Sequence, residues 1–408
     1  YGRGYFEQYR EDDDFATYGF NELTVNGNTV NTTDLIRRRW LDNNFYVLNA
    51  SANYKNNGLD MIFGTSISHY TGDHFGEVIW AEFASQSEIR DRYYNGNSRK
   101  NDVSGFAKAN YKLNDKISLY GDLQIRNVTY KTRGTSSDVI PFELDKNFSF
   151  FNPKAGITYE LNDKNDFYFS YARANREPNR TDFESNPNIK PEQLNDFELG
   201  WRHKSTNGFS FNANSYFMLY NEQLVLTGQL DDVGNTIRTN SGSSYRIGLE
   251  LETVIPVSSK FAIQSNMTLS TNKNEETIVS RNGAFVNLGK TDISFSPDIV
   301  ASNAFVYQPM PSFQMSLLSK FVGQQYMGNT DSEVSKLDNY FINDFNASYK
   351  IETNTFVKSI TISALVNNIF NKEYVSNGYY YTYDDNWTNP GVTTTIEGAG
   401  FYPQATRN

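Results

Sequence analysis

The feature that most constrains this chain is a two-residue alternation of apolar and polar side chains along much of its length. In 209–220 (FSFNANSYFMLY) the odd positions, from Phe209 to Leu219, are mostly apolar and the even positions mostly polar. The same split recurs in 117–126, 245–252, 261–269 and 360–367. This period is that of a β-strand with one apolar face, and half-buried strands of soluble proteins show it too. The chain is therefore predicted to be all-β, in a soluble or a membrane setting.

The connections between these segments favour the membrane setting. Short turns lie at 113–116, 160–166, 204–208 and 308–312. Long polar stretches lie near 10–36, 73–100, 132–146, 176–193, 223–244, 273–292, 327–340 and 375–400. Short and long connections alternate along roughly sixteen strand-like segments, as in a membrane barrel with short turns at one end and long loops at the other. Sandwiches and propellers have no reason to follow this rule, so the prediction is a transmembrane antiparallel β-barrel.

Composition is consistent with such a barrel and excludes several other classes of protein. The 408 residues include 28 Tyr and 30 Phe, which argues against disorder. A net charge of −10 without a basic cluster argues against binding nucleic acid. There is no Cys, and no apolar run approaches the ~18 residues of a membrane helix. No change of composition divides the chain, so residues 1–408 are predicted to form one domain.

Signals for catalysis or for a bound metal are weak. The sequence contains neither HExxH nor GxSxG, and its three histidines (His69, His74 and His203) are widely scattered. The acidic run 12–14 is better explained as a solvated loop than as a cation site. We therefore predict that the chain is not an enzyme and holds neither a metal nor a cofactor.

Two sequence boxes carry a family resemblance. The stretch FYFSYARANREPNR (167–180) enters a long connection, and NPNIKPEQLNDFELGWRHK (186–204) leaves it. A second box, VNNIFNKEYVSNG, spans 366–378. Together they resemble the paired boxes and the penultimate strand of TonB-dependent outer-membrane receptors. The departure is Asn-Arg-Glu-Pro at 175–178, where the family has an aromatic-Arg-Ala-Pro core.

The resemblance implies which part of such a receptor this chain would be. The family barrel has roughly 22 strands around a plugged lumen, and the chain matches roughly the last sixteen. We therefore expect the N-terminal plug, the early strands and the end of the last strand, which 401–408 begins, to lie outside the given sequence. The expected location is the outer membrane of a Gram-negative bacterium. The expected partners are the inner-membrane TonB complex, the plug, outer-membrane lipid and lipopolysaccharide, the ligand, and a surface lipoprotein.

The resemblance also implies active uptake of a large, scarce solute. A ferric siderophore or another iron chelate is the leading expectation, and cobalamin is the second. Haem is disfavoured because 181–185, between the two halves of the first box, contains no His. A passive porin would share the barrel but lack the paired boxes. An outer-membrane barrel enzyme would need a Ser/His pair, and no His has a good partner in sequence.

Candidate functional residues fall into two groups. Aromatic and Arg residues of the long stretches are predicted to contact the solute, because rings supply contact area and Arg supplies paired donors: Arg176, Arg180, Trp80, Tyr379, Tyr381 and Trp387. By resemblance, Glu198 and Glu250 would pair with Arg residues of the plug, and alternation places both on the polar face. The connection 176–193 is predicted to be ordered surface structure, acting either as a lid or as a rigid connector.

Overall fold

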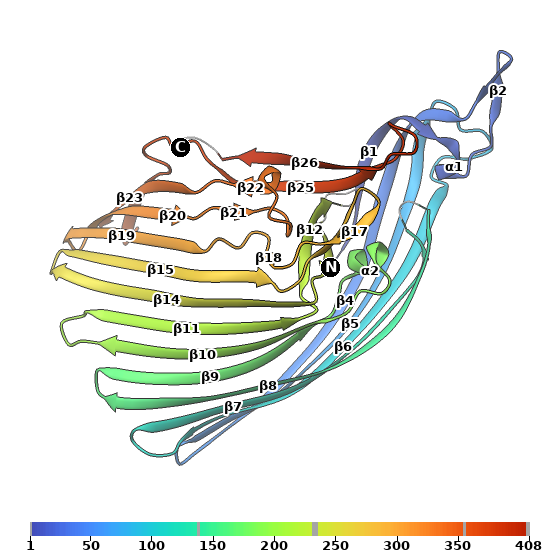
Figure 1. Cartoon of the computed structure of the whole chain (residues 1–408). Helices are drawn as coiled ribbons and strands as arrows, with labels where there is room; N and C mark the ends of the chain where they lie inside the picture. Colours follow the sequence, from blue (N-terminus) through green and yellow to red (C-terminus); the bar gives the residue numbers. More distant parts are fainter. Residues whose placement is uncertain (1, 137–138, 231–235, 354–355, 405–408) are drawn as a thin grey trace. The chain divides into compact units, whose positions relative to one another are not determined.

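The computed structural model describes residues 2–136, 139–230, 236–353 and 356–404, and most of them lie in one antiparallel sheet of 16 strands. Fifteen strands follow one another in chain order, each hydrogen-bonded to the next, and β18 (Thr291–Asp292) pairs with β15 at its side (Figure 1). The fifteen are β1 (Arg3–Asp14), β4 (Thr32–Asn56), β5 (Leu59–Ala81), β6 (Arg92–Lys112), β7 (Ile117–Thr135), β8 (Pro141–Asn162), β9 (Asn165–Arg176), β10 (Glu192–Lys204), β11 (Ser210–Asn221), β14 (Ser243–Ser258), β15 (Phe261–Asn274), β19 (Ile299–Met310), β20 (Phe313–Val322), β23 (Tyr340–Glu352) and β24 (Ser359–Val366). This sheet confirms the predicted fold class.

The chain divides into two compact units. The first comprises Tyr1–Ala109 and Asp122–Asn152, and the second Asn110–Gly121 and Pro153–Asn408. The division tests neither the boundaries nor the number of domains, so one barrel domain over residues 1–408 stays a prediction.

Long strands dominate the first unit. β4 has 25 residues and β5 has 23, about twice the 9–11 that cross a bilayer. They are joined by the two-residue turn Asn57–Gly58, whose positive φ angles of 41° and 82° belong to a tight hairpin. The opposite ends carry α1 (Phe15–Tyr18), capped by Asp14, and the hairpin of β2 (Leu23–Val25) and β3 (Asn28–Val30). Phe15 and Leu35 form a small core there with their neighbours.

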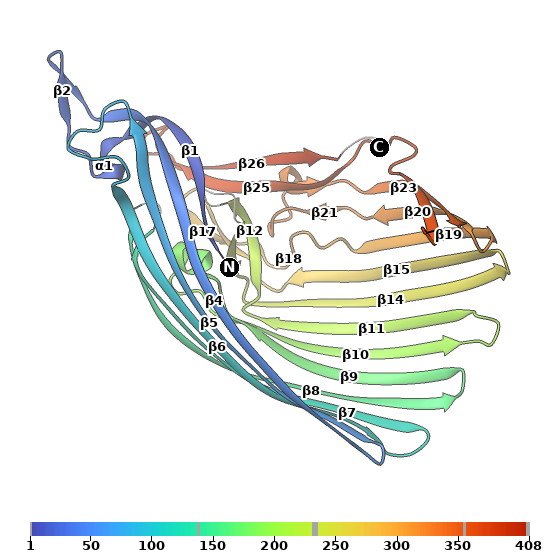
Figure 2. The same cartoon turned by 180° about the vertical axis from the view of Figure 1, so that it is seen from behind.

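Alternating faces organise the strands of the second unit, which run side by side in both views (Figures 1 and 2). Phe197, Phe217 and Ile247 are neighbours across β10, β11 and β14, and all three are exposed. On β10, Glu198 and Gly200 alternate with such exposed residues and point to the other face, where Glu198 is half-buried and Gly200 is buried. An apolar face that is contiguous and exposed is the outer surface expected of a membrane barrel. The predicted odd–even split of 209–220 and 245–251 is confirmed as two faces of the sheet.

The long connections hold more β-structure than predicted. The stretches 73–100 and 132–146 were predicted to be loops, but β5 continues to Ala81 and β6 begins at Arg92, while β7 continues to Thr135 and β8 begins at Pro141. Four small hairpins or strand pairs occupy connections of the second unit: β12 (Leu224–Leu230) with β13 (Thr236–Asn240), β16 (Ile278–Arg281) with β17 (Ala284–Asn287), β21 (Gln325–Tyr326) with β22 (Lys336–Leu337) after the 3-10 helix Glu333–Ser335, and β25 (Val375–Asp385) with β26 (Thr394–Pro403). The prediction missed these strands because some are very short, as β16 and β17 are, and others, such as β12 and β25, do not alternate apolar and polar residues.

The predicted final strand at 401–408 lies partly beyond the part of the chain that the structure describes, since β26 ends at Pro403. Helices are few and short, and no helix within the described residues is long and apolar enough to cross a membrane.

Candidate ligand-binding site

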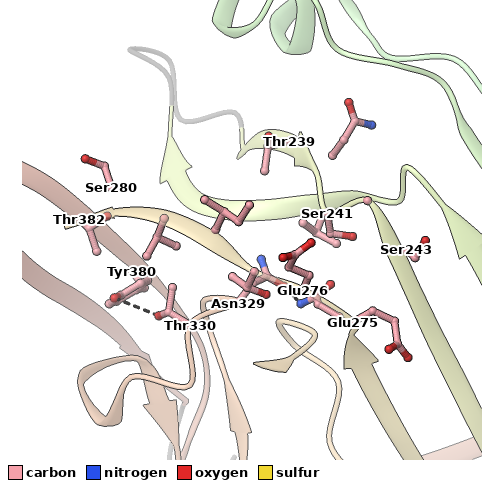
Figure 3. A pocket seen from close by; sticks show the side chains of 17 residues that line it. Thr239, Ser241, Ser243, Glu275, Glu276, Ser280, Asn329, Thr330, Tyr380 and Thr382 are labelled. Atoms are coloured by element: carbon pink, nitrogen blue, oxygen red, sulfur yellow. Dashed lines mark hydrogen bonds between the residues drawn. The ribbon is translucent and has the colours of Figure 1, made fainter. Parts of the chain in front are cut away.

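A cavity of about 650 Å³ lies among the long connections of the second unit (Figure 3). It is lined by 239–243, 274–280 and 329–330, together with Val225, Tyr380 and Thr382. Its walls therefore come from four separate connections, all at the end of the strands opposite the short turns. A volume of this size is typical of small-molecule sites.

Hydrogen bonds and a small core fix one wall of the cavity. Asn329 accepts from the backbone N–H of Ser294 at 2.9 Å and donates its amide to the carbonyl of Leu226. Thr330 donates to the hydroxyl of Tyr380 at 3.3 Å (Figure 3). The Tyr380 ring is buried against Met327 and Leu337. Because these partners come from different connections, the wall is shaped by contacts between loops.

The hairpin β16–β17 is docked on the hairpin β25–β26. Ser280 Oγ donates to Asp384 at 2.6 Å, and the Gly283 N–H donates to the same carboxylate at 3.1 Å. Arg281 forms an ion pair with Glu397 at 3.1 Å. Hydrogen bonds from Ser280 and then from Thr395 hold the pKa of Asp384 below its ordinary value. The ionised carboxylate therefore anchors the tip of β16–β17, which also supplies part of the cavity lining.

Two enclosed polar atoms at the cavity have no protein partner. Asn274 is fully buried, and its Nδ2 lies 3.4 Å from each of three acceptors while its Oδ1 has no partner. The Oγ of Ser241 is also enclosed without a partner. Both residues line the cavity. Buried polar atoms are nearly always hydrogen-bonded in folded proteins, so these two have hydrogen-bonding capacity that the described protein groups leave unused.

The surroundings of the cavity are acidic. Glu275 and Glu276 are on its lining; Glu275 pairs with Lys290 at 3.4 Å, and Glu276 accepts from the amide of Asn287. Among the lining residues that the structure describes, none is Lys, Arg or His. Beside the cavity, burial and the charge of Asp292 raise the pKa of Asp331. The described part of the lining therefore carries acceptors and negative charge but no cation.

A separate set of contacts orders the connection between β9 and β10. Asn179 caps α2 (Arg180–Ser185) in a capping box with Asp182. Asp182 is fully buried and accepts from Arg238 of the neighbouring hairpin at 3.1 and 2.8 Å. The backbone N–H and carbonyl of Lys190 both bind the amide of Asn240. The predicted ordered structure at 176–193 is confirmed, and hydrogen bonds attach it to the hairpin β12–β13.

Both arginines predicted to bind ligand are already paired within this structure. Arg176 donates to Glu192 at 3.1 Å, and Arg180 donates to Glu184 at 2.7 Å. Trp80 is half-exposed on β5 of the first unit. These contacts do not test binding of a solute, so the role of all three residues stays a prediction.

The predicted aromatic residues near the C-terminus form a row. Tyr379, Tyr381, Tyr383 and Trp387 stack in sequence, with ring centroids 6.3, 6.3 and 5.6 Å apart. The cavity is instead lined by Tyr380 and Thr382, which have the opposite parity. None of the six predicted ligand residues is among the described residues on the cavity lining.

The two glutamates predicted to contact the plug lie on neighbouring parts of one wall. Glu198 is on β10 and Glu250 on β14, with β11 between them. Glu198 faces Tyr216 across the ladder, and Asn214 donates to Glu250 at 3.3 Å. Neither carboxylate forms an ion pair with any residue that the structure describes. The wall can therefore accept cations from another segment, and that role stays a prediction.

No group of three or more His, Asp or Glu within the described ranges could hold a metal ion. Chemistry at the cavity depends on hydroxyl, amide and carboxylate groups.

Comparison with known proteins identifies the architecture. A family profile described as TonB dependent receptor-like, beta-barrel matches residues 2–369. A comparison with curated proteins finds no match. Similar solved structures include the siderophore receptor PiuA from Acinetobacter baumannii, with TM-score 0.61 and 15% identity over 91% of this chain and 55% of that one. The ferric-catecholate import receptor Fiu from E. coli K12 has TM-score 0.60 and 13% identity over 92% and 54%.

The copper transporter OprC is similar at TM-score 0.65 and 13% identity, over 91% of this chain and 60% of that one. At such identities these likenesses show the fold, and the chain spans about half the length of the structures it matches. The family is one of transporters rather than enzymes and resides in the outer membrane of Gram-negative bacteria. The chain therefore belongs to the β-barrel family of TonB-dependent receptors.

Proposed function

We propose that this chain is the barrel part of a transporter that takes up a large, scarce solute, a ferric siderophore or another iron chelate. The inner-membrane TonB complex supplies the energy, through a plug that precedes the barrel. Family membership supports the transport class. An iron chelate is favoured because similar structures include a ferric-catecholate import receptor and a siderophore receptor. A copper transporter is also among the similar structures, so a chelate of another metal is the alternative substrate.

The cavity among the long connections is the observation that carries the proposal. In the family barrel the long loops are extracellular, so the cavity would open toward the medium. Contacts between loops hold its walls before any solute is bound: Asp182 with Arg238, and Asp384 with Ser280. A preformed site loses less conformational entropy on binding, which suits capture of a dilute solute.

The acidic wall supports a plug as partner. Asp196, Glu198 and Glu250 lie on strands β10 and β14, and the two glutamates have no cation partner among the ion pairs of the described residues. A wall with unmatched negative charge is complementary to a basic surface. We propose that arginines of the plug supply that surface.

Uptake by cells tests the transport proposal. Cells that produce the full-length protein are given ⁵⁵Fe-labelled chelates, and the same strain without TonB is the control. The proposal requires accumulation of at least one chelate that disappears when TonB is removed. Cobalamin and haem are assayed in parallel. Uptake that persists without TonB indicates a passive porin, and uptake of cobalamin or haem alone excludes a ferric siderophore as the solute.

A further inference from the structure

We propose that the cavity bounded by Ser241, Asn274 and Tyr380 binds an uncharged or cationic group that is rich in hydrogen-bond donors, and that it rejects anionic groups. This inference rests on the proposed uptake function and deepens it by naming the chemistry of the bound group. Hydroxyl and ammonium groups are the donors that fit, whether a sugar, an amine or the periphery of a metal chelate carries them.

The two enclosed atoms define what the ligand must offer. An amide oxygen such as Asn274 Oδ1 only accepts hydrogen bonds, so its missing partner must be a donor. A hydroxyl such as Ser241 Oγ both donates and accepts, and it is satisfied by a ligand hydroxyl. Carboxylates and phosphates that are ionised offer acceptors alone and cannot serve Asn274 Oδ1.

Charge adds a second, independent constraint. An anion in the cavity would meet the carboxylates of Glu275 and Glu276, and no cation is present among the lining residues that have been described. Lys290 stands 3.4 Å from Glu275, but it is not on the lining. Sites for anionic ligands ordinarily supply Arg or Lys, and those of this region are engaged elsewhere: Arg281 with Glu397 and Arg238 with Asp182.

The size of the cavity sets the scale of the group. A space of about 650 Å³ exceeds what one ion or water needs and accommodates a sugar ring or one arm of a larger solute. Among ferric chelates the inference favours hydroxamates. Three singly charged hydroxamates neutralise Fe³⁺, whereas three doubly charged catecholates leave a trianion.

Three sugars of matched size test the cavity without iron. Glucosamine, glucose and glucuronate present a cationic, a neutral and an anionic version of one ring at about pH 6. Saturation-transfer NMR on the purified full-length protein should give binding of glucosamine and glucose. Glucuronate should bind about tenfold more weakly or not at all, because of like-charge repulsion. Stronger binding of glucuronate than of glucose would overturn the inference. So would the absence of binding of any of the three sugars at a concentration of about tens of millimolar.

Two variants locate the binding. Ser241→Ala removes a hydroxyl with no protein partner, so folding should be unchanged while sugar binding weakens about five- to tenfold, the loss of one hydrogen bond. Asn274→Leu removes the acceptor and should abolish binding, although it also deletes amide contacts to Thr291 and Asp292. Asn389→Ala, on the exposed tip of β25–β26, is the control and should bind as wild type does. Unchanged binding in Ser241→Ala contradicts the assignment even if Asn274→Leu fails to fold.

Import separates this inference from the proposed function. Ferrioxamine B is a ferric trishydroxamate with a pendant ammonium, and its N-succinyl derivative carries a carboxylate instead. TonB-dependent import should favour the ammonium form, and Ser241→Ala should reduce that preference. If sugars bind as expected but no chelate is imported, the iron proposal fails and the cavity stands. If chelates are imported with no dependence on pendant charge or on Ser241, the inference about the cavity fails alone.

Discussion

Replacing Arg238 with Met removes the cation that pairs with a fully buried carboxylate in the connection between β9 and β10. Asp182 is 0% exposed and receives two hydrogen bonds from Arg238, whose own side chain is 19% exposed. Met retains most of the aliphatic volume of Arg. The substitution therefore tests the ion pair with little change in packing.

The expected cost follows from what Asp182 retains. Removing one partner of a buried pair typically costs about 3–5 kcal/mol, because the other charge is left uncompensated. Asp182 still accepts from the backbone N–H of Asn179 at 2.8 Å, so we expect the lower end, about 3 kcal/mol. In Asp182→Asn/Arg238→Met both charges are gone and the capping acceptor remains. The double variant should regain part of the loss.

Hydrogen–deuterium exchange of the connection measures the effect. The reporters are the backbone N–H groups of Phe183, Asn186 and Ile189, which donate within the connection. A local cost of about 3 kcal/mol corresponds to about 100-fold faster exchange, since 1.4 kcal/mol is tenfold. Arg133→Met breaks an exposed pair with Glu143 and should leave these amides unchanged. If these amides exchange in Arg238→Met at a rate within about threefold of the wild-type rate, the ion pair does not hold this connection.

Three further outcomes are expected. In the full-length protein, Glu198→Gln with Glu250→Gln should loosen the plug and raise pore conductance; a channel as tight as wild type would exclude these glutamates as its anchors. Leu249→Arg, on the exposed apolar face, should destabilise the barrel by about 2–4 kcal/mol in urea titrations in lipid, while Thr268→Arg beside Glu250 should be tolerated; equal costs would contradict the two faces. Because the pKa of Asp384 lies below 3.8, docking of β16–β17 should be complete above that value and lost as pH falls through the lower folded-state pKa. The hydrogen-exchange rate of the Gly283 N–H, followed as a function of pH, measures this docking. Loss of docking already at about pH 6 would contradict the prediction.

Sequence alone predicted the strands that meet lipid, and physical chemistry explains why. A bilayer requires one apolar face on every crossing strand, so alternation in 209–220 and 245–251 marks both the strand and its orientation. Beyond the bilayer this requirement ends. The outer part of β5 stays paired with β4, but apolar residues such as Phe75 and Val78 mix with polar ones and no face is consistently apolar, so 73–100 was wrongly predicted to be a loop.

The candidate site was predictable only at the level of segments. The stretches 223–244, 273–292, 327–340 and 375–400 were recognised as long and polar, and the cavity is built from all four. Individual residues were not recognised, because three consecutive tyrosines at 379–381 give no parity to choose between the stacked row and the buried Tyr380. Similarly, nothing in the sequence around Asn274 shows that its carbonyl lacks a partner, which depends on contacts between connections.

Four arginines of the second unit are already paired with carboxylates: Arg176, Arg180, Arg238 and Arg281. A cation that already balances a carboxylate cannot neutralise an incoming anion without breaking that pair, and for Asp182 with Arg238 the pair is buried. Arg176, Arg180 and Arg281 each have a glutamate partner within 3.1 Å. The same pairs hold the connections in place around the cavity. The described lining residues therefore include carboxylates but no cation, because these pairs tie the loops together, and we infer that a solute entering the cavity brings hydrogen-bond donors.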